Sequence, residues 1–190
     1  MKAKTIIQIG ACKGNDEVTD FVRENEIGLL VLVEPLGGLR NEELLKCYED
    51  TPNVVIYNVA ITPKPTTEKQ KFYIHPDGPG AASLDIKHVA RHFPDSIDKI
   101  VSVDVPCMTM YQLFDLHQIT DVDLLAIDAE GYDAEIIGSI DLKKFNIKRI
   151  VFEYINLASC SYLGEFREFL MKQGYTLNFY SHYDIEAVKQ

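Results

Sequence analysis

The feature that most constrains the fold is a regular alternation of short apolar runs with helical patterns, starting almost at the first residue. Apolar runs typical of buried strands lie at 5–9, 29–33, 54–59, 123–127 and 149–152. Segments with helical spacing of their apolar residues lie at 16–25, 41–48, 85–92, 108–117, 133–140 and 162–173. Strands that alternate with helices predict β-α-β units and a mostly parallel sheet. We therefore expect a doubly wound α/β fold.

The end and the middle of the chain depart from this alternation. Two final apolar runs, 175–180 and 185–188, are close enough to predict an antiparallel hairpin. In the middle, 71–74 and 100–105 predict short strands, and the Pro- and Gly-rich stretch 75–82 predicts a loop. No repeat or linker divides the chain. Its 190 residues, 46% of them hydrophobic, suffice for one core, so we expect residues 1–190 to form a single domain.

Charge and composition exclude several classes of partner. The net charge of −10 gives no general attraction to phosphate backbones or anionic lipids, so neither a nucleic acid nor a membrane is expected as partner. No run approaches the roughly 20 apolar residues that span a bilayer. Four scattered cysteines, Cys12, Cys47, Cys107 and Cys160, form no C-x-x-C pair. Reduced thiols and a cytoplasmic location are expected.

The turn after the first predicted strand is the first candidate ligand site, because open α/β sheets bind ligands beyond the carboxyl ends of their strands. Gly10 and Gly14 permit a tight turn and a close approach to the backbone. The dinucleotide fingerprint would need glycine at 12 and 15, where this chain has Cys12 and Asn15. The turn therefore suits a nucleoside better than a pyrophosphate, although two glycines alone are also common turn chemistry.

Glu34 strengthens the nucleoside hypothesis. It ends the second apolar run and follows Gly10 by 24 positions, near the roughly 20 expected of a ribose-binding acid. A carboxylate there can accept hydrogen bonds from both ribose hydroxyls. The alternative is a solvated carboxylate at a strand end.

Three segments together resemble one family. They are I-Q-I-G-A-C-K-G at 7–14, V-E-P at 33–35 and I-D-A-E-G at 127–131. On these motifs the chain resembles the FkbM-type family of S-adenosylmethionine-dependent class I methyltransferases, over nearly its whole length. The resemblance implies a Rossmann-like, seven-stranded sheet that ends in an antiparallel hairpin. The family usually carries an acidic residue before the first glycine of the turn; here that place is taken by Gln8, which has no charge to attract the cofactor's ammonium group.

The resemblance also implies the cofactor, S-adenosylmethionine, and the residues that hold it. Its methionine part would lie against the first turn, its ribose against the acid after the second strand, and its adenine beyond the third strand. The residues are Gly10, Ala11, Cys12, Gly14, Glu34, Asn58, Ala60 and, near the sulfonium, Asp128.

Three carboxylates are candidates for the base that deprotonates an acceptor hydroxyl: Asp128, Glu130 and Glu153, each at or near a strand's carboxyl end. Glu130 could equally cap the following helix. Two such carboxylates could bind Mg²⁺, which we do not expect. His88 and His92 have metal-chelating i, i+4 spacing, but no third ligand accompanies them in the sequence, so we expect a surface helix and no metal site.

The sequence leaves several functions open. The leading hypothesis is O-methylation of a sugar or glycosylated small metabolite. The alternatives are a nicotinamide-dependent oxidoreductase with an atypical turn and a non-catalytic nucleoside-binding module. A homodimer is compatible with the sequence but is not indicated by it.

Overall fold

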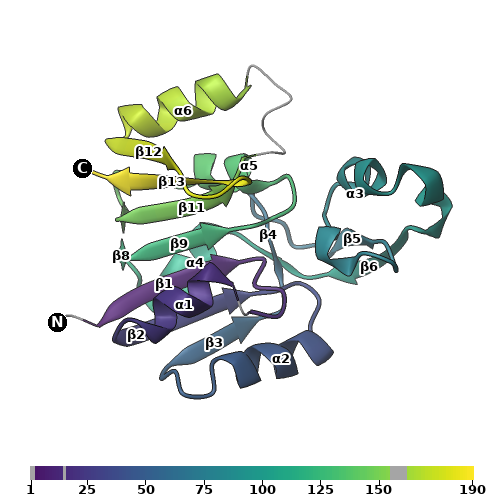
Figure 1. Ribbon diagram of the computed structural model, residues 1–190, viewed down its shortest axis with the longest axis horizontal. Coiled ribbons are helices and arrows are strands. Elements are labelled where there is room, and N and C mark those ends of the chain that lie inside the picture. Colours follow the sequence, from purple (N-terminus) through teal and green to yellow (C-terminus); the bar gives the residue numbers. More distant parts are fainter. Residues whose placement is uncertain (1–2, 15, 155–161) are drawn as a thin grey trace.

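The computed structural model describes residues 3–14, 16–154 and 162–190, and its centre is a seven-stranded sheet (Figure 1). The strand order is β12-β13-β11-β9-β1-β2-β3. The strands are β1 (Lys4–Ile9), β2 (Ile27–Val33), β3 (Val54–Tyr57), β9 (Leu124–Ile127), β11 (Arg149–Glu153), β12 (Tyr175–Phe179) and β13 (Asp184–Lys189). β13 runs antiparallel to both neighbours, whereas the other pairings are parallel. The predicted α/β sheet with an antiparallel C-terminal pair is confirmed.

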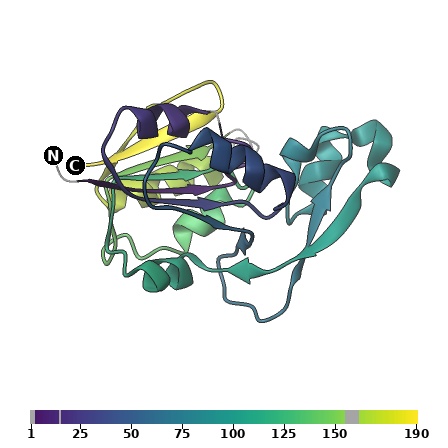
Figure 2. The same cartoon turned by 90° about the horizontal axis from the view of Figure 1, so that it is seen from below.

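Helices cover both faces of this sheet. In Figure 2, α1 (Glu17–Arg23) and α2 (Leu39–Cys47) lie above the sheet and α4 (Met110–His117) lies below it. The lower layer also includes α5 (Asp133–Gly138) and α6 (Tyr162–Lys172).

Alternate strand residues feed the two cores, as the two-residue period of a strand requires. Ile6 and Leu30 belong to the core under α1 and α2, whereas Ile7 and Val31 belong to the core under α4 and α5. The result is a doubly wound, three-layer fold.

Helix α1 begins where the sequence places its cap. The Asp16 carboxylate accepts hydrogen bonds from the backbone N–H groups of Val18 (3.0 Å) and Thr19 (3.1 Å), and the Thr19 hydroxyl accepts one from the Asp16 N–H (3.3 Å). This capping box aims the helix N-terminus at the edge of the sheet where β1 ends. The other candidate cap, Asn15, lies outside the described residues.

The strand order reverses beside β1. The chain builds β2 and β3 on one side of it, then crosses to place β9 on the other side. Connections that leave in opposite directions open a crevice at the carboxyl ends of the two strands, which is the usual ligand site of such sheets. Gly10 and Gly14 of the first turn lie at this edge, as do the predicted acidic residues Glu34, after β2, and Asp128, after β9.

Residues 62–106 form a lobe that projects from this edge (Figure 1). They lie between two short paired strands, β4 (Ala60–Ile61) and β7 (Cys107–Met108). Within the lobe, β5 (Gln70–Ile74) pairs antiparallel with β6 (Val101–Val105). Between these strands lie η1 (Pro79–Ala81), α3 (Ile86–His92) and η2 (Pro94–Lys99). The sequence predicts the two strands but not their pairing.

A parallel pair, β8 (Asp121–Val122) with β10 (Asn146–Ile147), lies outside the main sheet. None of the described helices has the length and apolar character needed to cross a membrane. Cys12, Cys47 and Cys107 are free thiols, and Cys160 lies outside the described residues.

Candidate active site

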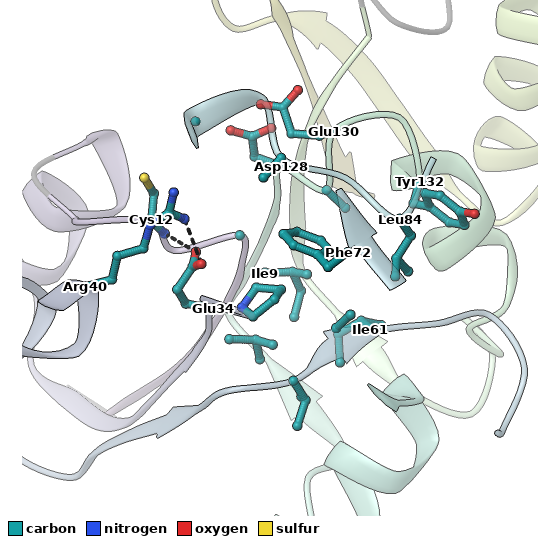
Figure 3. A pocket seen from close by; sticks show the side chains of 18 residues that line it. Ile9, Cys12, Glu34, Arg40, Ile61, Phe72, Leu84, Asp128, Glu130 and Tyr132 are labelled. Atoms are coloured by element: carbon teal, nitrogen blue, oxygen red, sulfur yellow. Dashed lines mark hydrogen bonds and ion pairs between the residues drawn. The ribbon is translucent and has the colours of Figure 1, made fainter. Parts of the chain in front are cut away.

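A crevice runs along the carboxyl ends of β2, β1 and β9, and it has two pockets that share Ile9, Gly10, Cys12 and Asp128. We call the first the Glu34 pocket; it also contains Arg40 and extends to Phe72 and Leu84 of the lobe (Figure 3). We call the second the Asp128 pocket; it extends over the start of α1 to the ends of β11 and β13. A ligand lying in both would cross directly over the first turn.

Gly10 allows the three strand ends to meet. Its φ is +77°, and a Cβ atom there would lie 1.9 Å from the backbone oxygen of Asp128. The N–H groups of Gly10 and Ala11 both donate to the Val33 carbonyl, at 2.9 and 3.0 Å. Only glycine fits this approach, so the residue has a structural reason as well as the predicted ligand-facing one.

Glu34 is buried, with 2% of its surface exposed, and its carboxylate is held from three sides. Oε2 accepts from the Cys12 N–H (2.9 Å), while Oε1 accepts from the Leu36 N–H (2.8 Å) and from the Arg40 guanidinium (2.7 Å). Burial raises the pKa of Glu34 above its usual value, and the Arg40 charge is the largest of the effects that oppose this rise. The predicted solvated alternative is wrong, since this carboxylate is enclosed.

Arg40, which the sequence analysis did not single out, connects the pocket to the lobe. Its second guanidinium nitrogen donates to the Pro79 carbonyl at 2.7 Å. One side chain therefore holds the Glu34 carboxylate and the edge of the lobe together. No sequence pattern marks this residue, because both of its partners are set by the tertiary fold.

The other predicted cofactor residues are distributed unevenly around the crevice. Gly14 lines the Asp128 pocket and Ala60 lines the Glu34 pocket. Ala11 is fully buried in the core under α1 and lines neither pocket. Asn58 also lies outside both linings: its amide donates to the Glu34 carbonyl (2.9 Å) and pairs with Asn41.

The three predicted catalytic carboxylates are brought together. Asp128, Glu130 and Glu153 each have an oxygen within 4.8 Å of the others'. Figure 3 shows the Asp128 and Glu130 carboxylates side by side at the rim of the Glu34 pocket. Desolvation by the surrounding crevice, and then the negative charges of Glu130 and Glu153, raise the pKa of Asp128 to about 7. The Asp128 side chain nevertheless remains accessible to solvent.

Asp133 holds the two strand tips that carry these carboxylates. It is 2% exposed and accepts the N–H groups of Ala129 and Glu153, both at 3.3 Å. Burial, followed by the charges of Asp128 and Glu153, raises the pKa of Asp133 well above its usual value. The sequence predicts that Asp133 lies at the start of α5. It does not predict that Asp133 joins the ends of β9 and β11, because its partner Glu153 lies 20 positions further along the chain.

The Asp128 pocket is strongly acidic. Five carboxylates line it: Asp16, Glu17, Asp128, Glu153 and Asp184. No lysine or arginine occurs among its described lining residues. Gln8, the amide at the family's usual acidic position, donates to the Asp16 carboxylate at 2.7 Å. Asp16, which is hydrogen-bonded to Gln8, therefore supplies the negative charge that position 8 lacks.

The lobe holds Glu130 at both its backbone and its side chain. The residue has a φ of +49°, which is uncommon for a residue other than glycine. Its carbonyl accepts from the Ser83 hydroxyl (2.9 Å), and its carboxylate lies 2.7 Å from the Nε2 atom of His88. Because Tyr132 caps α5 without a side-chain hydrogen bond and Glu130 faces the lobe, the helix-capping alternative for Glu130 finds no support.

His88 itself corrects the sequence analysis. The spacing of His88 and His92 predicts a surface helix, but His88 is completely buried against the loop that contains Glu130. The prediction failed because α3 packs its His88 side onto a segment 42 positions further along the chain.

The chain was compared with curated proteins and with solved structures. No curated protein matches the sequence. Among solved structures, precorrin-6y C5,15-methyltransferase from Geobacter metallireducens is 14% identical, with a TM-score of 0.49 over 100% of this chain and 82% of that one. Aeropyrum pernix fibrillarin, solved with S-adenosyl-L-methionine, is 13% identical, with a TM-score of 0.46 over 98% and 67%. M. capricolum TrmK, solved with S-adenosyl-homocysteine, is 12% identical, with a TM-score of 0.43 over 100% and 63%.

The sequence comparison covers most of the chain. The family model described as the methyltransferase FkbM domain matches residues 8–177. That range runs from β1 into β12, and it includes the lobe, the acidic strand tips and every crevice residue except Tyr183 and Asp184. The chain therefore belongs to the FkbM methyltransferase family.

Proposed function

We propose that this chain binds S-adenosylmethionine along the crevice and transfers its methyl group to a hydroxyl of a sugar or a glycosylated small metabolite. The observation that carries the proposal is the single crevice that joins a buried carboxylate after β2 to a cluster of carboxylates after β9, across a glycine turn. This arrangement offers one end for a ribose and the other for a reacting centre.

The Glu34 pocket fits an adenosine. Apolar side chains supply most of its wall, including Val59, Ile61, Phe72 and Leu84, which suits a flat purine ring. A carboxylate has about four acceptor positions, of which Glu34 uses three. One ribose hydroxyl can use the remaining position. A second hydroxyl needs the position taken by Arg40, so we expect the Arg40 guanidinium to withdraw from Glu34 when the nucleoside binds.

The Asp128 pocket fits the methionine part of the cofactor. Asp16 offers the carboxylate that an ammonium group needs, and Gln8 orients it. The backbone of Gly10 and Cys12 is common to both pockets, which suits the link between ribose and sulfur. The family's usual acid before the turn is, on this interpretation, replaced by a Gln8–Asp16 pair.

Asp128 is the carboxylate best suited to remove a proton from the acceptor. Bound S-adenosylmethionine supplies a methyl group that is already activated on a sulfonium, so the chain has to align the acceptor and deprotonate it. A base works best when its pKa lies near the working pH, and the pKa of Asp128 is raised to about 7. Desolvation raises that pKa most, and the charges of Glu130 and Glu153 add to the rise. Glu153 can also contact the acceptor's other hydroxyls.

The same charges favour a neutral acceptor. Five carboxylates in one pocket repel a phosphate or another anionic acceptor, whereas S-adenosylmethionine, with a sulfonium, an ammonium and one carboxylate, carries a net positive charge. We therefore propose a small hydroxylated molecule as acceptor rather than a nucleic acid or an anionic membrane surface.

Calorimetric titration of the purified chain with S-adenosylhomocysteine tests the cofactor. We expect binding that weakens by about 10- to 100-fold for each charge-assisted hydrogen bond lost in Glu34→Ala. Glu42→Ala, which removes an exposed carboxylate from the first turn of α2, is the matched control and should bind like the wild type. Absence of binding, or binding of NAD in its place, would overturn the proposal. Screening hydroxylated acceptors with labelled S-adenosylmethionine then tests the transfer itself.

A further inference from the structure

Two histidines of α3 and one glutamate form a donor cluster where the lobe meets the sheet. His88, His92 and Glu130 each offer one ligand atom, and the three atoms lie within 4.8 Å of one another. The sequence provides the i, i+4 histidine pair but shows no third ligand near it. The fold supplies that ligand from the loop after β9, so a distant part of the chain completes the set of three ligands.

His88 is the buried member of the cluster and faces Glu130 through one ring nitrogen. Its imidazole is 0% exposed, yet only one ring nitrogen has a partner, the Glu130 carboxylate at 2.7 Å. The other nitrogen, Nδ1, is buried with no hydrogen-bond partner among the described residues. Nε2, which already faces the Glu130 carboxylate, is the nitrogen that can share an ion with it, whereas Nδ1 lies near Gly131, 3.1 Å from the position of a Cβ atom added there.

His92 gives the cluster access to solvent. Its ring lies one helical turn from that of His88, with the centroids 4.7 Å apart, and the residue is exposed. A cation can therefore reach the buried His88–Glu130 pair from the His92 side. The cluster thus has a buried inner ligand, His88, and a solvent-exposed outer one, His92.

We propose that His88, His92 and Glu130 bind a divalent transition-metal ion of the zinc type. Two imidazoles and one carboxylate are a ligand set that suits Zn²⁺, with a fourth position left for water or another oxygen. Mg²⁺ prefers oxygen ligands and is not expected here. On binding, His88 and Glu130 exchange their mutual hydrogen bond for bonds to the ion. The ion would then fasten α3 of the lobe to the loop that carries Asp128.

Titration of the metal-free full chain with Zn²⁺ alone, followed by calorimetry, tests the site without any methyl donor or acceptor. We expect one ion per chain and a rise in the melting temperature. Co²⁺ substitution should give visible absorption without the charge-transfer band of a thiolate ligand, which separates this site from the free cysteines.

His92→Ala is the decisive variant, since His92 is exposed and its removal leaves the core intact. We expect Zn²⁺ affinity to fall by more than the roughly 10–100-fold that the loss of a supporting partner costs. His182→Ala, another exposed histidine, should bind like the wild type. Glu130→Gln should also weaken binding. No binding to the wild type, unchanged binding to His92→Ala, a thiolate band, or a preference for Mg²⁺ over Zn²⁺ would each overturn the proposal.

Discussion

Strand β9 has an aspartate near each end, and the two are held in opposite surroundings. At the amino end, Asp123 accepts the Lys148 ammonium (2.6 Å) and the Thr5 N–H (2.9 Å). Partial burial acts to raise the pKa of Asp123, but these two hydrogen bonds outweigh it and lower the pKa below its usual value. At the carboxyl end, desolvation and then the charges of neighbouring carboxylates raise the pKa of Asp128 to about 7.

The difference separates stability from function along a single strand. A charge paired with a cation and a backbone donor stabilises the fold. A charge crowded by like charges costs stability, and such sites are kept where a reactive group is needed. In open α/β sheets the carboxyl ends of the strands are also where ligands bind. The unfavourable cluster of negative charges therefore lies at the edge of the sheet where a methyltransferase needs its reactive groups.

The largest expected effect comes from Gly10→Ala, which pushes the first turn away from the Asp128 end of β9. The added Cβ would lie 1.9 Å from the Asp128 carbonyl oxygen, and the residue would keep a φ of +77°. Overpacking and left-handed strain each cost about 1–3 kcal/mol, so we expect a loss of about 3 kcal/mol or more. Urea unfolding measures it, and S-adenosylhomocysteine binding should be lost as well.

Gly138→Ala is the matched control for that substitution. Gly138 lies at the end of α5, and a Cβ atom added there would have no neighbouring atom within 4 Å. Alanine there should leave the chain as stable as the wild type, or more stable by up to about 1 kcal/mol. Equal destabilisation by both variants would show that the contact between the first turn and β9 is not what makes Gly10 necessary.

The features that could be predicted from the sequence are those encoded by local patterns. The periods of strand and helix are local, so β1, β2 and β9 were predicted to within about two residues at each end. The positions of Glu34 and Asp128 followed, because a residue at the carboxyl tip of a parallel strand must lie at the same edge of the sheet as other such tips.

The partners of those residues could not be predicted. Arg40 reaches Glu34 and Pro79, and His88 reaches Glu130, through contacts that the fold, and not the local sequence, creates. No periodicity encodes such contacts. The lobe was missed for the same reason: β5 and β6 are recognisable one by one, but their pairing closes a loop whose course only the tertiary structure defines.

A smaller effect, opposite in sign, is expected from Asp128→Asn. Between its usual pKa of 3.8 and its folded value of about 7, Asp128 keeps a proton that the unfolded chain releases. This group's contribution to stability therefore falls as the pH rises through that window. The asparagine variant escapes the penalty and should be more stable above pH 7, by about 1 kcal/mol once solvent screening of this accessible side chain is allowed for.

Unfolding curves between pH 4 and pH 8 measure this prediction. The gap between wild type and Asp128→Asn should open as the pH rises, while Asp98→Asn, which removes an exposed carboxylate in the lobe, should run parallel to the wild type. A variant less stable than the wild type at pH 8 would mean that Asp128 is held by favourable contacts, and the contrast with Asp123 would fail.

The smallest effect is expected at the other end of the strand. The lowered pKa of Asp123 means that its contribution is fully present above the usual value of 3.8 and is lost as the pH falls through the lowered value. Asp123→Asn should therefore be less stable than the wild type at pH 7, by about 0.5 kcal/mol, since Lys148 is half exposed and such pairs contribute about 0.2–1 kcal/mol. The loss should shrink at high salt and as the pH falls below 3.8. Parallel pH profiles for Asp123→Asn and Asp128→Asn would erase the difference between the two ends of β9, whereas profiles of opposite slope would establish it.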